Sequence, residues 1–154
     1  MGKIVSINLS RKKGTIKQPV AKAELVAGLG IAGDAHAAAG NRQVSLLMQE
    51  SIEKQKRRME KNPGEKVKLK PGVFAENLTT AGIDLLALRL GDELKLGNGL
   101  RLRVSKIGKE CHTRCAISDR AGDCVMPREG IFCEVAIGGS VRVGDRIEQA
   151  ERHA

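Results

Sequence analysis

The chain has no tryptophan, no tyrosine and only two phenylalanines among its 154 residues. Modules that bind single-stranded RNA or DNA commonly stack the bases on aromatic side chains. The scarcity of aromatic residues therefore argues against that class of protein. It also means that the hydrophobic core has to be built from valine, isoleucine, leucine, alanine and methionine.

Cysteine is absent outside residues 111–133, where all four cysteines lie, and the chain contains neither a long apolar run nor a signal peptide. Disulfides that stabilise secreted proteins typically occur throughout a small domain, and a membrane-spanning helix needs about 20 consecutive apolar residues. These absences predict a protein of the reducing cytoplasm.

Acidic residues are outnumbered by basic ones, 18 to 27, which gives a formal net charge of +9. A basic chain favours an anionic partner, which could be a phosphate-bearing small molecule, a nucleic acid or an acidic surface. A length of 154 residues suits one domain, and we expect residues 1–154 to form it.

Alternation of apolar and polar residues is the clearest pattern in the chain, and it is typical of half-buried strands. It occurs in residues 3–9, 20–26, 93–105 and 135–147. In the third stretch, Gly97-Asn98-Gly99 supplies the backbone freedom that a tight hairpin turn requires. The fourth stretch repeats the pattern around Gly138-Gly139.

A helical period replaces the alternation from about Ser45, because Met48, Ile52 and Met59 fall on one face. This predicts one amphipathic helix that ends before Asn62-Pro63-Gly64. Together the patterns predict a mainly β fold, a barrel with one substantial amphipathic helix inserted. The glycines of residues 28–33 lack the G-x-G-x-x-G spacing of a dinucleotide-binding fold.

Cys111 is the first candidate for chemistry, since the alternating strand before it stops at Ile107-Gly108. Thiolate is the nucleophilic and metal-binding form of cysteine, and the cations at Lys109 and Arg114 favour it. The alternative is that Cys111 is a small buried hydrophobe with cationic neighbours in solvent.

A polar segment, residues 70–84, gathers short hydrogen-bonding side chains around Asn77 and Thr79. Its turn-forming composition predicts that it is not a simple strand. Such side chains suit the recognition of a polar ligand, and the alternative is that Thr79 or Thr80 caps a short helical turn.

Eight motifs, taken together and in order, resemble the MOSC domain, the family named after the C-terminal part of molybdenum-cofactor sulfurases. They are Gly33-Asp34-Ala35-His36, Arg42-Gln43-Val44-Ser45-Leu46-Leu47, Pro71-Gly72-Val73-Phe74-Ala75-Glu76-Asn77-Leu78-Thr79-Thr80, the Gly91-Asp92 corner, Cys111, Arg128-Glu129-Gly130-Ile131-Phe132, Gly138-Gly139 and Gly144-Asp145. The resemblance covers nearly the whole chain and is strongest to small stand-alone bacterial members.

This resemblance implies a β-barrel that binds the molybdenum cofactor, a molybdopterin that carries a phosphate. The hallmark cysteine of the family corresponds to Cys111, which would ligate molybdenum or act as a sulfur carrier. The implied activity is either that of an oxidoreductase acting on N-hydroxylated compounds or sulfur transfer. An electron-donor protein or a cofactor-biosynthesis protein is the implied partner, and neither membrane nor nucleic acid is expected.

The resemblance also implies a set of cofactor-binding residues around Cys111. We expect Ser45, Asn77 and Thr79 in its pocket, where Asn77 and Thr79 would bond the amide-like edge of the pterin. The paired donors of a guanidinium match phosphate oxygens, so we expect arginine to hold the phosphate. The candidates are Arg42, Arg128 and Arg114, with His36 as an additional donor.

Two departures from the family pattern keep other functions open. Ala75 stands where many relatives have glycine, and Cys115, Cys124 and Cys133 are additional thiols. Four cysteines could form a structural zinc site in a non-enzymatic binding module, although neither half has the C-x-x-C spacing. The third candidate is a basic barrel that binds nucleic acid.

Overall fold

The computed structural model describes residues 2–10, 17–34, 37, 40, 43–59, 76–97, 99–107 and 130–150, with the backbone alone for residues 55–59. The predicted mainly β class is confirmed. The elements in chain order are β1 (Gly2–Leu9), β2 (Gln18–Val20), β3 (Lys22–Val26), β4 (Gly30–Ile31), β5 (Val44–Met48), α1 (Gln49–Met59), β6 (Leu78–Ala81), the 3₁₀ helix η1 (Leu85–Ala87), β7 (Glu93–Leu96), β8 (Leu100–Ile107), β9 (Ile131–Ile137), β10 (Gly139–Arg142) and β11 (Arg146–Gln149).

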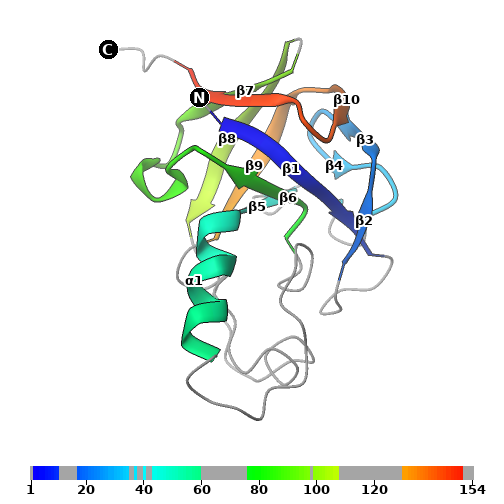
Figure 1. Ribbon diagram of the computed structural model, residues 1–154. Coiled ribbons are helices and arrows are strands. Elements are labelled where there is room, and N and C mark those ends of the chain that lie inside the picture. The colour runs from blue at the N-terminus through cyan, green and yellow to red at the C-terminus, as the bar shows by residue number, and fades with distance from the viewer. Residues whose placement is uncertain are drawn as a thin grey trace.

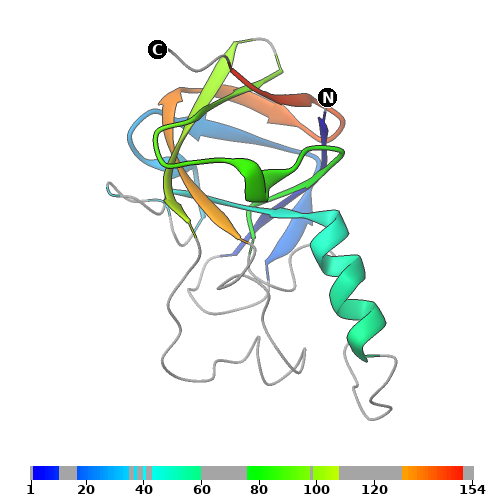
Figure 2. The same ribbon diagram turned by 90° about the vertical axis from the view of Figure 1, so that its left-hand side faces the viewer.

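Seven strands close into a barrel, as Figures 1 and 2 show. Their order is β11-β7-β8-β9-β5-β6-β1, and the pairing of Gly2 with Ile147 joins β1 to β11 and completes the ring. Closure removes the free strand edges that an open sheet would expose. Strand β2 extends the sheet beyond β1, while β10, β3 and β4 form a second, smaller sheet.

Aliphatic side chains fill the barrel, as the aromatic-poor composition predicts. Alternate residues of β7 and β8 point inward, so β7 contributes Leu94 and Leu96 while β8 contributes Leu100, Leu102 and Val104. All five are at most 6% exposed. Removing one of these leucines would cost about 2–5 kcal/mol of stability, because a cavity is left behind.

The hairpin predicted around Gly97-Asn98-Gly99 is confirmed as β7 and β8, with Leu94 opposite Leu102. Both Gly97 and Gly99 have positive φ, 51° and 114°, a region that L-residues avoid. The three strands of the tail are also confirmed, yet β9 does not pair with β10. The chain instead passes at Gly138 from the barrel to the smaller sheet, where β10 pairs with β3.

The predicted helix from about Ser45 is wrong at its beginning. Residues 44–48 form strand β5, and all five are buried, so β5 lacks the alternation that marks a half-buried strand. Helix α1 begins only at Gln49, and among residues 49–54 only Ser51 and Ile52 are buried. The structure thus contains a shorter helix than the substantial amphipathic one that we predicted.

Two smaller predictions also need correction. Residues 78–81 form strand β6, so the polar segment does contain a simple strand, and neither Thr79 nor Thr80 is a helix cap. Asp84 caps η1 instead, and its side chain accepts a hydrogen bond from the amide of Leu86 at 3.0 Å. The strand predicted over residues 20–26 is divided at Ala21 into β2 and β3.

Within the described residues, no helix has the length and apolar character needed to span a membrane.

Candidate functional site

The strand predicted to end just before Cys111 is β8, and its last residue is Ile107. Ile107 pairs with Ile131, the first residue of β9. The connection that carries Cys111 therefore begins and ends at neighbouring positions on two adjacent strands. The end of β1 and the start of β2 lie at the same end of the barrel (Figures 1 and 2).

Five of the predicted site residues lie outside the described residues, so their roles stay predictions. They are His36, Arg42, Cys111, Arg114 and Arg128. The three that the structure describes, Ser45, Asn77 and Thr79, are all at most 5% exposed.

Ser45 on β5 and Asn77, the residue before β6, form hydrogen bonds with each other. The amide and hydroxyl of Ser45 donate to Asn77 Oδ1 at 3.0 and 3.2 Å, and the amide of Asn77 donates to Ser45 Oγ at 3.0 Å. Asn77 Nδ2 donates to the carbonyl of Asn8 at 3.2 Å, and the amide of Asn8 donates to the carbonyl of Asn77 at 2.7 Å. Asn77 therefore joins β1, β5 and β6, and its Nδ2 keeps one hydrogen beyond these bonds.

Thr79 belongs to a second chain of buried hydrogen bonds on β1 and β6. Ser6 Oγ donates to Asn8 Oδ1 at 2.8 Å, and Asn8 Nδ2 donates to Thr79 Oγ1 at 3.1 Å. Thr79 Oγ1 in turn donates to Glu76 Oε2 at 2.8 Å. Every donor is directed toward the carboxyl group of Glu76, which is completely buried, so the chain of hydrogen bonds ends on Glu76 Oε2.

A buried ion pair fixes the glycine-rich motif to the end of β1. Lys17 Nζ lies 2.6 Å from Asp34 Oδ1, and both side chains are 0% exposed. The amide of Ser10 donates to the same oxygen at 3.1 Å. Asp34 of the family-like motif therefore holds neighbouring chain segments together in this structure.

Sequence reasoning missed Lys17, Asn8 and Ser6, and it assigned no role to Glu76. Lys17 follows the basic run of residues 11–13 and looks like another solvated lysine. Asn8 and Ser6 occupy the polar positions of an alternating strand, where exposure is the usual expectation. The one available signal was the asparagine at position 8, between the apolar Ile7 and Leu9.

Cys133 is the one cysteine among the described residues, and it lies in the barrel core opposite Val44 and Val104. It is 0% exposed, and burial raises the pKa of its thiol far above the usual range. A thiol that stays protonated is a poor metal ligand or nucleophile, so Cys133 does not share the role predicted for Cys111. The same burial argues against the four-cysteine zinc site, and no described group of three or more His, Cys, Asp or Glu could hold a metal.

Comparison with known proteins gives the family and the fold. The family model described as the MOSC domain matches residues 33–148. No curated protein matches the chain.

Solved structures resemble the whole described fold at low sequence identity. The YuaD protein from Bacillus subtilis is 20% identical with a TM-score of 0.77, covering 99% of this chain and 98% of that one. YiiM from Geobacillus stearothermophilus is 20% identical with a TM-score of 0.75, covering 99% and 76%. YiiM from Escherichia coli is 18% identical with a TM-score of 0.71, covering 100% and 72%. Since the family model spans well over half of the sequence, the chain belongs to the MOSC domain family.

Proposed function

We propose that this protein binds the molybdenum cofactor through a cysteine of the β8–β9 connection, with Cys111 as molybdenum ligand or sulfur carrier. Membership of the MOSC family supports the choice of cofactor. The observation that carries the choice of site is the burial of Cys133, because the remaining cysteines, Cys111, Cys115 and Cys124, all belong to that one connection.

The chemistry of this donor set fits the cofactor. Molybdenum is thiophilic, and an ionised cysteine is a soft ligand suited to it. When bound, the cofactor would supply a metal that passes electron pairs and oxygen or sulfur atoms to a substrate. In our proposal, the protein contributes the thiolate, together with Arg42, Arg114 and Arg128 for the phosphate and His36 as a further donor.

For Ser45, Asn77 and Thr79 the described contacts support a positioning role. The side-chain oxygen of Asn77 accepts two hydrogen bonds, and the hydroxyl hydrogen of Thr79 is bonded to Glu76. We propose that all three fix the strands at this end of the barrel, and that Asn77 in addition donates the remaining hydrogen of Nδ2 to the cofactor. Two reactions follow from the family, reduction of N-hydroxylated compounds and sulfur transfer.

Purification from a host that makes the cofactor tests the proposal. We expect the parent protein to retain molybdenum by elemental analysis and a fluorescent pterin after oxidation. Cys111→Ser should lose both, whereas Cys133→Ala, the matched control in the core, should retain them. Retention by Cys111→Ser with loss in Cys115→Ser or Cys124→Ser would transfer the role to that thiol. Stoichiometric zinc in place of molybdenum would overturn the proposal.

Two assays on the loaded protein separate the candidate reactions. Consumption of a hydroxylamine or amidoxime in the presence of reduced viologen indicates a reductase. Release of cyanide-reactive sulfur from Cys111 indicates a sulfur carrier, because a persulfide sulfur is transferred to cyanide as thiocyanate. In either case Cys111→Ser should be inactive and Cys133→Ala active.

A further inference from the structure

Gln43 has a buried side-chain amide that the proposed function does not use. The residue is 4% exposed, and both polar groups of its side chain are bonded. Oε1 accepts from the amide of Val135 at 2.9 Å, and Nε2 donates to the carbonyl of Gly40 at 3.0 Å. Val135 belongs to β9, whereas Gly40 belongs to the connection between β4 and β5. The side chain of Gln43 therefore joins that connection to the barrel.

The bond to Val135 takes the place of a further backbone pair between β5 and β9. Val44 lies opposite Cys133 in this antiparallel pair, so an extension of β5 in the same register would place Arg42 opposite Val135. The N–H of Val135 instead donates to the Gln43 side chain, and its C=O accepts from the amide of Gly28 at 3.0 Å. Both backbone groups of Val135 are thus occupied, and β5 begins at Val44.

The backbone of Gln43 is fixed from a second side by β4. A Cβ on Gly30 would lie 2.4 Å from the carbonyl oxygen of Gln43, closer than side chains approach in folded proteins. Gly30 also has a φ of 126°, which L-residues rarely adopt. Since Gly30 begins β4 and Gln43 directly precedes β5, the two ends of the β4–β5 connection meet here. Connections whose ends lie close together are often functional.

A further attachment of the connection lies at Asp34. Its carboxylate forms the buried ion pair with Lys17, and its carbonyl accepts from the amide of Ala37 at 3.1 Å. Two residues that we propose for the phosphate of the cofactor, His36 and Arg42, belong to this connection. His36 comes two positions after Asp34, and Arg42 directly precedes Gln43. Each of them is therefore close in the chain to a residue that is fixed to the barrel.

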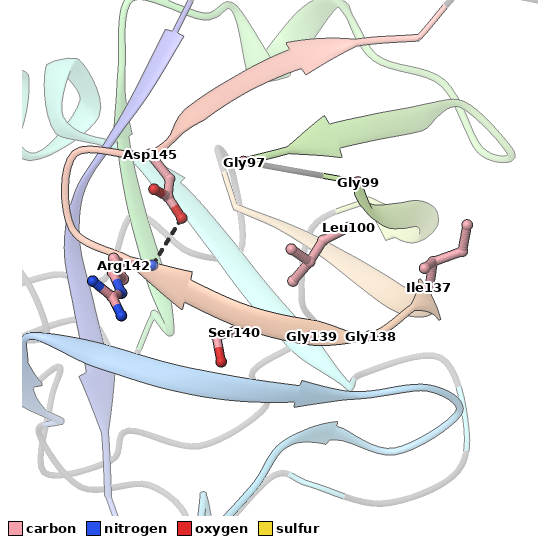
Figure 3. Close-up of a pocket in the computed structure, with 9 residues that line it drawn as sticks. All are labelled: Gly97, Gly99, Leu100, Ile137, Gly138, Gly139, Ser140, Arg142 and Asp145. Atoms are coloured by element: carbon pink, nitrogen blue, oxygen red, sulfur yellow. Dashed lines mark hydrogen bonds between the residues drawn. The ribbon is translucent and has the colours of Figure 1, made fainter.

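The cavity beyond the end of β9 gives Gln43 no other role. It has a volume of about 650 Å³ and lies between the β7–β8 turn and strand β10, as Figure 3 shows. Its lining consists of Gly97, Gly99, Leu100, residues 137–140, Arg142 and Asp145. None of Gln43, Gly40 and Val135 belongs to this lining, so the bonds of Gln43 serve the β4–β5 connection.

We propose that Gln43 is a positioning residue of the cofactor site. Its side chain ends β5 at Val44, and thereby directs Arg42 toward the phosphate of the cofactor instead of into the sheet beside β9. This inference rests on the proposed function, in which Arg42 binds that phosphate. A guanidinium on a segment that is already fixed loses less conformational entropy when it binds, so its paired hydrogen bonds contribute more to affinity.

A double-mutant cycle distinguishes this role from a purely structural one, because a residue that only stabilises the barrel acts independently of Arg42. The probe is metal-free molybdopterin, whose binding does not depend on the metal ligand. It is measured by anaerobic ultrafiltration, with the pterin detected by fluorescence after oxidation. We expect Arg42→Ala to weaken binding about tenfold and Gln43→Met about fivefold. In the Arg42→Ala background, Gln43→Met should change the affinity less than about twofold.

Asp92→Ala is the control for lost stability. Asp92 is also buried, and its side chain also has two partners, the amide of Arg89 at 2.8 Å and Gln149 Nε2 at 3.2 Å. It belongs to the turn before β7 and has no role in the proposed site. We expect Asp92→Ala to leave the affinity for molybdopterin within about twofold of the parent, although it lowers the free energy of unfolding.

Amide hydrogen exchange of the parent protein keeps the test valid if Gln43→Met fails to fold. Coupling between two sites is reciprocal, so molybdopterin should slow exchange at the Val135 amide, the donor to Gln43. Exchange at the amide of Val143, which donates to Ala21 in the smaller sheet, should not change.

The outcomes separate this inference from the proposed function. Failure of the parent to bind molybdopterin would overturn both. Binding by the parent with equal affinity for Gln43→Met, with the same loss from Gln43→Met in both backgrounds, or with unchanged exchange at Val135 would overturn the role of Gln43 alone.

Discussion

Asp92 and Asp145 form the same turn at two places in the barrel. In each, the aspartate side chain accepts a hydrogen bond from the backbone N–H three residues earlier, that of Arg89 at 2.8 Å or Arg142 at 2.9 Å. The amide of each aspartate returns a bond to the carbonyl of the same arginine, at 3.0 and 3.1 Å. The preceding glycines have positive φ, and strands β7 and β11 begin directly after the two turns.

We predict that Asp92→Ala destabilises the protein more than Asp145→Ala. Each substitution removes the acceptor for a turn amide, at a cost of about 1 kcal/mol. Asp92 is also buried and accepts a bond from Gln149 Nε2 at 3.2 Å, so its loss should cost about 1 kcal/mol more. Urea unfolding of the two variants measures the difference, and equal midpoints would show that burial of Asp92 contributes nothing.

Asn77→Ala should reduce the free energy of unfolding by about 2–4 kcal/mol, because the substitution removes a buried side chain that accepts from the amide of Ser45 and donates to the carbonyl of Asn8. Asn77→Asp should restore the bonds to Ser45 but not the one to Asn8, since an ionised carboxylate cannot donate. Chemical denaturation measures both variants. A loss below about 1 kcal/mol for Asn77→Ala would contradict the positioning role that we propose.

Much of the barrel was predictable because its signals are local. Gly97 and Gly99 flank the hairpin turn, and alternation marks β8 well. The boundary between β5 and α1 was not predictable in the same way. Leu47, on the outer side of the sheet, is buried and apolar, so β5 lacks the alternation of apolar and polar residues that identifies a strand. The network that joins Asn8, Ser45 and Asn77 depends on strand order, which no local pattern specifies.

Lys17→Met should destabilise the protein by about 3–5 kcal/mol, because it leaves the Asp34 carboxylate buried without the ammonium that lies 2.6 Å away. The double variant Lys17→Met, Asp34→Asn should recover part of the loss, since the neutral amide oxygen can still accept from Ser10. Thermal and urea unfolding of the two variants provide the test. A double variant less stable than Lys17→Met would show that the charge of Asp34 serves another group.

Cys133 gives a prediction on pH. Since burial raises the pKa of its thiol in the folded protein, folding disfavours the thiolate. The stability from the protonated thiol is fully present below the pKa of the unfolded chain, about 8.5, and falls as the pH rises above it. Cys133→Ala should therefore lose less stability than the parent between about pH 8.5 and 10. Identical pH profiles would contradict this, as would rapid labelling of Cys133 by a thiol reagent in the native protein.

Thr79 and Thr80 are neighbours on β6 and both are completely buried, yet their hydroxyl groups differ in hydrogen bonding. Thr79 Oγ1 donates to Glu76 and accepts from Asn8, whereas Thr80 Oγ1 forms no hydrogen bond with any described residue. Valine has nearly the shape of threonine and lacks the polar atom. Thr80→Val should therefore stabilise the protein by about 1 kcal/mol, because a desolvated hydroxyl is removed.

Thr79→Val is the matched control and should have the opposite sign. It removes the donor to a buried carboxylate and leaves Asn8 Nδ2 without an acceptor, for a loss of about 2–3 kcal/mol. Urea unfolding of both variants under the same conditions gives the two signs directly. A destabilising Thr80→Val would show that its hydroxyl has a partner in the folded protein, whereas a neutral Thr79→Val would show that the chain of hydrogen bonds to Glu76 does not stabilise the barrel.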